Sequence, residues 1–210
     1  MVKKLSILCL SILFCGSVAW AADSAGNRKD QMVRLGIKTG IHLFYLVSTP
    51  FVLEIPGEDF TFGLVYGSGD LVSTSSSYSS STGWTTVEDK WTFSTTELTG
   101  RYYFGNSFNV PFGYAMYNIH KDDFKTGTAV YSIDYTVTQL NVGLGNDWTF
   151  DWGGFIAADW FQGGAGLSEE IKCDLTSGTE SASTKLGCST DAGKINAFGG
   201  ALIVTFGFGF

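Results

Sequence analysis

Five charged side chains share one phase of the alternating segments of this sequence and could line a polar interior. Glu97 and Arg101 are four residues apart, so in an extended strand they point to the same side. Asp134, Asp151 and Asp159 lie opposite their aromatic neighbours in the same way. Such charges could form a gated, ion-lined path, or they could pair with one another because an unpaired buried charge is costly. A narrow interior would favour pairing.

Serine–histidine catalysis would have to use one of two histidines, His42 or His120. His120 is followed by Lys121 and two aspartates, and no serine lies two positions away. Ser132 could reach His120 only across a hairpin, which disfavours a serine–histidine hydrolytic site. We therefore expect no enzyme activity and no cofactor.

Two cysteines, Cys173 and Cys188, lie outside the N-terminal leader, and an even pair in an exported chain predicts a disulfide. Closing that loop would stabilise the fold by roughly 3 kcal/mol on a chain-entropy estimate. No histidine lies between the two cysteines, and two thiolates do not complete a tetrahedral set. We therefore expect no metal site.

The leader itself, residues 1–21, has the pattern of a cleaved signal peptide. Lys3 and Lys4 precede an apolar run, residues 5–18, that is too short to span a bilayer, and the leader ends on Ala19-Trp20-Ala21. The whole chain has a formal net charge of −7, which argues against nucleic acid as a partner.

The rest of the chain alternates with period two, which predicts β-strands. The clearest run is the last, where Phe206, Phe208 and Phe210 share one face. Six strands are predicted at residues 60–72, 91–105, 110–120, 128–145, 149–162 and 194–210. Two more come from residues 31–55, split around residues 40–43. Within 128–145 the apolar positions change from odd to even numbers, which predicts a bulge near Gln139.

The predicted connections alternate in length. Short turns are expected at residues 56–59, 105–110 and 145–147, and long polar loops at 73–90 and 163–192. The serine-rich loop, 73–90, has the composition of a solvated, flexible segment.

These strands suit either a soluble sandwich or a barrel in a membrane. Aromatic residues gather toward strand ends, short and long connections alternate, and charged or small residues lie opposite the aromatics, all of which favour the barrel. In lipid every backbone N–H must be paired within the protein, so the sheet must close on itself. We predict an all-β fold, an eight-stranded antiparallel, up-and-down transmembrane β-barrel.

The leader, the Gly-rich β pattern and the terminal "TFGFGF" resemble the small outer-membrane β-barrels of Gram-negative bacteria, the OmpA/OmpX/OmpW-like group. The resemblance implies an outer-membrane location and contact with outer-membrane lipid and lipopolysaccharide. It implies that Phe206, Phe208 and Phe210 are an assembly signal read by the barrel-assembly machinery. Residues 22–30 would be a periplasmic N-terminal segment, and residues 31–210 the barrel.

The role expected from the resemblance is non-enzymatic. The barrel would display surface loops, residues 73–90 and 163–192, for an extracellular partner or for envelope integrity. Two alternatives stay open: a narrow channel for small solutes, as in the OmpW-like branch, and modification of lipid A, which some eight-stranded barrels catalyse.

Overall fold

The structure is a computed structural model that describes residues 23–79, 83–126, 128–179 and 199–210. The predicted signal peptide, residues 1–21, and Cys188 lie outside these ranges. Within them, no helix is long and apolar enough to cross a membrane.

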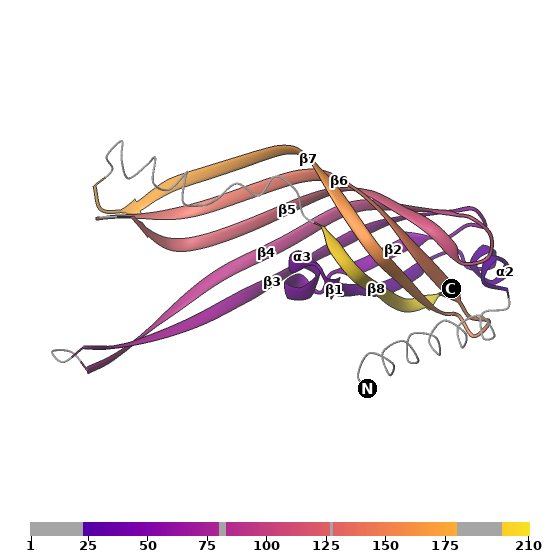
Figure 1. Ribbon diagram of the computed structural model, residues 1–210, viewed down its shortest axis with the longest axis horizontal. Helices are drawn as coiled ribbons and strands as arrows, with labels where there is room; N and C mark the ends of the chain where they lie inside the picture. The colour runs from indigo at the N-terminus through magenta and orange to yellow at the C-terminus, as the bar shows by residue number, and fades with distance from the viewer. Residues whose placement is uncertain (1–22, 80–82, 127, 180–198) are drawn as a thin grey trace, which may run out of the picture.

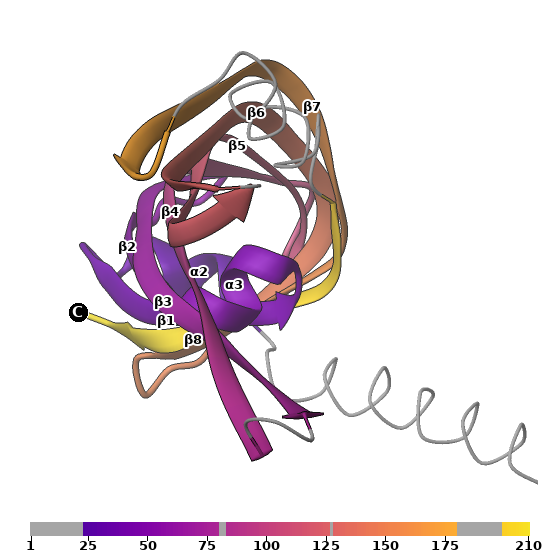
Figure 2. The same cartoon turned by 90° about the vertical axis from the view of Figure 1, so that its left-hand side faces the viewer.

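Eight antiparallel strands form one closed ring, in which each strand pairs with its neighbour in sequence and β8 pairs with β1 (Figures 1 and 2). The strands are β1 Arg34–Ile41, β2 Phe51–Ile55, β3 Phe60–Ser79, β4 Gly83–Tyr103, β5 Phe108–Thr126, β6 Ala129–Thr149, β7 Gly154–Ser177 and β8 Gly200–Gly209. The described residues also contain two short helices, α2 Ser24–Lys29 and α3 Leu43–Ser48. The predicted fold class is confirmed.

The wall of the barrel is low on one side and tall on the other. Strands β8, β1 and β2 have 10, 8 and 5 residues, whereas β3 to β7 have 19 to 24. We call the end with the short turns between β2 and β3, β4 and β5, and β6 and β7 the short-turn end, and the opposite end the tall end. The β1–β2 connection contains α3, which lies inside the ring (Figure 2).

Two predicted loops are strands for much of their length. Residues 73–79 and 83–90 continue the β3–β4 ladder without a register shift, and residues 163–177 belong to β7. The interpretation of residues 73–90 as a flexible loop was therefore wrong. Serine lowered the apparent apolar content there, but the threonine, tyrosine and tryptophan residues of this segment are types that favour strands.

Strand β6 points the same set of residues inward along its length, but the chemical type of these residues changes from one end to the other. Odd-numbered residues are buried along nearly its whole length. Toward the short-turn end they are polar, such as Gln139 and Asn141, and toward the tall end they are apolar, such as Tyr131 and Ile133. The register irregularity lies on β7, where Leu167 is the extra residue opposite Thr138 and Gln139. The predicted bulge near Gln139 was therefore at the correct height but on the wrong strand.

Large apolar side chains on the outside form an apolar belt around the short-turn half of the barrel. The belt consists of Leu35, Phe51, Leu53, Ile55, Phe60, Phe62, Leu64, Tyr66, Leu98, Tyr102, Phe104, Phe108, Phe112, Tyr114, Met116, Leu140, Val142, Leu144, Ile156, Phe161, Phe206, Phe208 and Phe210, all at least 37% exposed. Above it the outward positions of β5 and β6 are polar, beginning with Asn118 and Thr138. The outer wall is therefore divided into an apolar and a polar zone.

Closure of the ring depends on a close approach of β1 and β8. A Cβ atom at Gly207 would clash with the carbonyl oxygen of Leu35 and lie 2.6 Å from Gly36 Cα. We predict that Gly207→Ala destabilises the barrel by roughly 1–3 kcal/mol, because the strands would have to move apart. The measurement is the temperature at which the folded protein unfolds in detergent.

Gly163→Ala on β7 is the matched control, since the nearest atom to its Cβ is 4.0 Å away. Equal melting temperatures for both variants would show that this strand contact does not limit stability.

Candidate functional site

The inside of the barrel is the candidate site, because buried charges gather there. Among the described residues, four cations and four anions are almost completely buried in the short-turn half: Arg28, Arg34, Lys38 and Arg101, with Glu54, Glu97, Asp147 and Asp159. Along β4, Tyr103, Arg101 and Glu97 mark three successive levels of this cluster. We call the eight charged residues the interior charge cluster.

The level nearest the short-turn end is held by Asp147 on β6. Arg34 Nη1 donates to Asp147 Oδ2 at 2.8 Å, and the Tyr103 hydroxyl donates to the same oxygen at 2.6 Å. The Arg28 guanidinium of α2 lies 3.6 Å from the Tyr103 ring centroid, and its Nη1 donates to the Asn106 carbonyl at 2.8 Å. Helix α2 therefore covers this end of the interior.

The middle level is a bidentate pair between Arg101 on β4 and Asp159 on β7. Arg101 Nη1 and Nη2 donate to Asp159 Oδ1 and Oδ2 at 2.5 and 3.1 Å. Glu54 on β2 lies between two arginines, 3.7 Å from Arg101 Nε and 3.9 Å from Arg34 Nη1. The pair therefore connects β4 with β7 across the interior of the ring. Two parallel hydrogen bonds from the planar guanidinium to one carboxylate fix its orientation as well as its distance.

The upper level surrounds Glu97. Lys38 Nζ and the Tyr45 hydroxyl donate to Glu97 Oε2 at 2.9 and 2.8 Å. Asn141 Nδ2 donates to Glu97 Oε1 and to the Tyr117 hydroxyl, both at 3.1 Å. Since Tyr45 belongs to α3, this carboxylate joins the helix to the barrel wall.

Helix α3 fills the interior above Glu97 with aromatic rings. Phe44 packs 4.4 Å from Tyr117 and 5.5 Å from Phe93, centroid to centroid, and His42 stacks 4.2 Å from Tyr45. The helix is short and follows Gly40, whose φ of 147° lets the chain turn from β1 into the ring. Beyond it an apolar core continues toward the tall end through Ile119, Tyr135, Val137 and Ile203.

The structure brings together three of the five predicted interior charges, Glu97, Arg101 and Asp159, and places the other two outside. Asp134 is exposed on the outer face of β6, and Asp151 is exposed in the β6–β7 turn. Their predicted interior position was wrong. For Asp134 the reason is that the apolar partners on β6 face inward at this height; for Asp151, β6 ends at Thr149.

Sequence reasoning missed all five of the other residues of the interior charge cluster. Arg34 and Lys38 have the same four-residue spacing as Glu97 and Arg101, so this signal was present in β1. Asp147 was assigned to a turn, whereas β6 continues to Thr149.

His120 lies on the outer face of β5, four residues above the last apolar-belt residue of that strand, Met116. Its Nδ1 is 2.7 Å from Asp134 Oδ1 and its Nε2 is 3.3 Å from Asp122 Oδ1. Ser132 donates to Asp122 at 3.4 Å. Both ring nitrogens face carboxylates, so the geometry does not place the imidazole as a base for Ser132.

The structure also bears on the predictions for a metal site and for a disulfide. Within the described residues, no group of three or more His, Cys, Asp or Glu side chains has an arrangement that could hold a metal ion. Cys173 on β7 is disulfide-bonded and packs beside Ile133 and Tyr131. Because Cys188 lies outside the described residues, its pairing with Cys173 stays a prediction.

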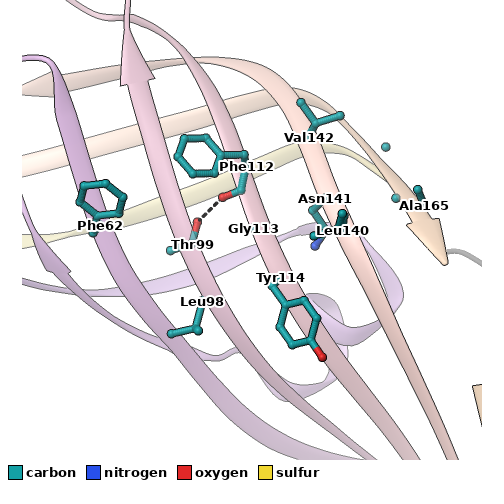
Figure 3. A pocket seen from close by; sticks show the side chains of 12 residues that line it. Phe62, Leu98, Thr99, Phe112, Gly113, Tyr114, Leu140, Asn141, Val142 and Ala165 are labelled. Atoms are coloured by element: carbon teal, nitrogen blue, oxygen red, sulfur yellow. Dashed lines mark hydrogen bonds between the residues drawn. The ribbon is translucent and has the colours of Figure 1, made fainter. Parts of the chain in front are cut away.

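A groove of about 770 Å³ lies on the outer wall, within the apolar belt (Figure 3). Phe62, Leu98, Phe112 and Tyr114 stand on one side of it, and Leu140 and Val142 on the other. It forms where β7 carries the small residues Gly163, Gly164 and Ala165.

The comparisons with known proteins give one structural likeness. The crystal structure of CarO from Acinetobacter baumannii superimposes with a TM-score of 0.43 and 11% identity, over 87% of this chain and 99% of that one. No protein-family model and no curated protein matches the sequence. The eight-stranded fold rests on the hydrogen-bonded ring of this chain itself.

Removal of one partner tests whether the interior charge cluster is structural. Arg101→Ala leaves Asp159 buried without its cation and leaves Glu54 with Arg34 alone, and we predict a loss of about 3–5 kcal/mol of stability. The measurement is thermal unfolding in detergent, together with conductance in a planar bilayer.

Lys90→Ala is the control, because it removes only an exposed ion pair with Asp70 and should leave the melting temperature nearly unchanged. An unchanged melting temperature of Arg101→Ala with a large rise in conductance would instead identify Arg101 as a gate.

The environment of His120 predicts a pH effect at the tall end. The hydrogen bond to Asp134 is the main reason that the His120 pKa is raised, with Asp122 adding to it and burial opposing it. A raised pKa means that the pair stabilises the fold below the unfolded value, about pH 6.5. That stabilisation is lost as the pH rises through the folded pKa.

We predict that Asp134→Asn lowers the His120 pKa, as followed by NMR titration of its ring Cε1–H signal. Asp151→Asn in the distant turn should leave it unchanged. A His120 pKa that is the same in wild type and Asp134→Asn would contradict the contact.

Proposed function

We propose that this chain is an integral outer-membrane β-barrel of a Gram-negative bacterium. In this proposal the protein is not an enzyme. It is a barrel with a closed interior that is anchored in the outer membrane and presents its tall end at the cell surface. The observation that carries the proposal is the combination of an apolar outer belt with an interior filled by paired charges and by α3.

The apolar belt supports the membrane location. Its members alternate with buried polar residues, such as Glu97 between the outward Leu98 and Thr96, which is the pattern of a barrel wall in lipid. Phe206, Phe208 and Phe210 are 46%, 57% and 70% exposed, an unusual arrangement for a protein in water. The closed ring also pairs the strand backbones, as a lipid environment requires.

The interior favours a sealed barrel over a channel. Within the interior charge cluster, which consists of described residues in the short-turn half, four cations and four anions balance, so the cluster has no net charge to attract a permeant ion. A continuous path would require α3 to leave, which breaks the contacts of Tyr45 with Glu97 and Lys38 and exposes the Phe44–Tyr117 packing.

The two histidines favour a non-enzymatic role. His120 faces two carboxylates, and His42 lies 3% exposed inside the barrel, stacked on Tyr45. Among the described residues, Ser132, the serine nearest to His120 across the hairpin, donates to Asp122 instead of to the imidazole, which does not suit a hydrolase or acyltransferase. The outer groove beside Phe112 has apolar walls and would be occupied by lipid chains in this proposal.

The partners in this proposal follow from the two zones of the outer wall. Outer-membrane lipid and lipopolysaccharide would contact the apolar belt, and the barrel-assembly machinery would read the C-terminal phenylalanines. An extracellular partner would meet the polar tall end, which includes residues 73–79, 83–90 and 163–177.

Fractionation and conductance together test the proposal. We predict that the protein is recovered in the outer-membrane fraction and changes gel mobility on boiling, because its barrel stays folded in detergent until heated. In planar bilayers the wild-type protein should give no regular conductance steps.

Phe44→Ala/Tyr45→Ala, which removes aromatic volume from α3, should give openings that the wild type lacks, whereas Phe60→Ala on the outer face should not. A single gel band from a soluble fraction would refute the membrane location. Regular steps from the wild type would refute the sealed interior and favour the channel alternative.

A further inference from the structure

The upper part of β3 has a strand edge that no described strand covers. Strand β2 pairs with β3 only from Phe62 to Tyr66; Pro50 lies against Gly67, and α3 lies against Gly69. From residue 70 to residue 79, β3 pairs with β4 alone. In Figure 1 this β3–β4 hairpin diverges from β5, β6 and β7 toward the tall end.

The direction of the backbone groups at this edge follows from the ladder. Tyr103 N donates to the Asp59 carbonyl, so odd-numbered residues of β3 exchange hydrogen bonds with β4, and the register continues without a shift to Ser79. Even-numbered residues, including Val72 and Thr74, therefore point their N–H and C=O groups to the uncovered edge. These groups repeat every second residue.

The other strand edges at the tall end carry features that hinder pairing with another chain. The β4 edge contains Glu88, Asp89 and Lys90; the β5 edge has a bulge at Asp122 and Asp123; and the upper part of β7 alternates Glu169, Glu170, Lys172 and Asp174. Charges and bulges are the usual protection of such edges. Residues 71–79 of β3, "LVSTSSSYS", have no charge, no proline and no bulge.

We propose that the uncovered edge of β3, residues 70–79, binds an extended segment of another polypeptide by strand addition. The inference rests on the proposed function, which places this hairpin in water outside the membrane. A peptide backbone is the occupant because it carries donors and acceptors at the repeat of the edge, which a glycan or a lipid chain lacks. Asp70, the one charge at the edge, is already paired with Lys90 and Thr92.

The hairpin also gains from a third strand. Leu71 and Val72 are 45% and 54% exposed, on opposite faces of a ribbon only two strands wide. Such a ribbon is marginally stable in water, and an added strand would bury one apolar neighbour on each face. The occupant is therefore a segment with β-branched or apolar residues opposite these two positions.

The test uses detergent-solubilised full-length protein and a labelled synthetic peptide of residues 83–93. This segment of β4 pairs with residues 69–79 of β3 in the folded protein, so its sequence is compatible with pairing to β3. Binding is followed by fluorescence anisotropy. Thr74→Pro removes an edge-facing N–H and leaves the β4-facing groups in place, so we expect the affinity to fall about tenfold. Thr74→Val, which keeps the N–H, is the matched control and should bind as the wild type does.

A second peptide carries N-methyl groups on four consecutive central residues. Because the N–H groups of an extended peptide point alternately to its two sides, this peptide cannot donate hydrogen bonds on either side and should not bind. Equal binding of the methylated peptide, or of Thr74→Pro, would overturn strand addition in favour of a side-chain contact. No binding of the unmodified peptide to folded protein would also overturn it. Self-association that Thr74→Pro abolishes and the peptide does not displace would assign the edge to a second copy of the chain instead. None of these results bears on the gel and conductance tests of the barrel.

Discussion

Closure of the ring between its first and last strands is the constraint on which the rest of the structure depends. Strands β1 and β8 pair from Arg34 with Gly209 to Ile41 with Ala201, through glycines that let the two backbones approach. A ring of eight strands encloses a narrow interior, and here α3 and the inward side chains fill it. The charges that enter this space therefore meet one another at close range, and pairing is the arrangement that limits their desolvation cost.

The two halves of the barrel place polar and apolar side chains on opposite faces of the wall. In the short-turn half, polar groups are inside and large apolar groups outside, as at Asn141 and Val142. In the tall half the same strand places Ile133 inside and Ser132 outside. The upper half is thus built like a soluble protein and the lower half for an apolar surrounding, with Glu97 and α3 at the junction.

Period-two alternation was sufficient to predict the number of strands, their antiparallel order and the first two short turns. The third turn was predicted at residues 145–147, but β6 continues to Thr149 and the turn lies at residues 150–153. Alternation alone does not tell which face is inside, because that depends on the solvent outside; Asp134 was misplaced for this reason. Helix α3 was missed because "LFYLVS" is six residues long and apolar throughout, which gives no helical period. The pairing of Arg101 with Asp159 joins residues 58 apart in sequence, and only the closed ring brings them together.

The most direct test of this account is a scan of β6 in a lipid bilayer with spin labels at the outward positions 132, 134, 136, 140, 142 and 144. The account predicts that labels at 140, 142 and 144 are accessible to oxygen, which partitions into lipid, and that labels at 132, 134 and 136 are accessible to a water-soluble nickel complex. The crossover should fall between residues 136 and 140. Oxygen accessibility that continued unchanged to residue 132, or nickel accessibility at all six positions, would contradict the account.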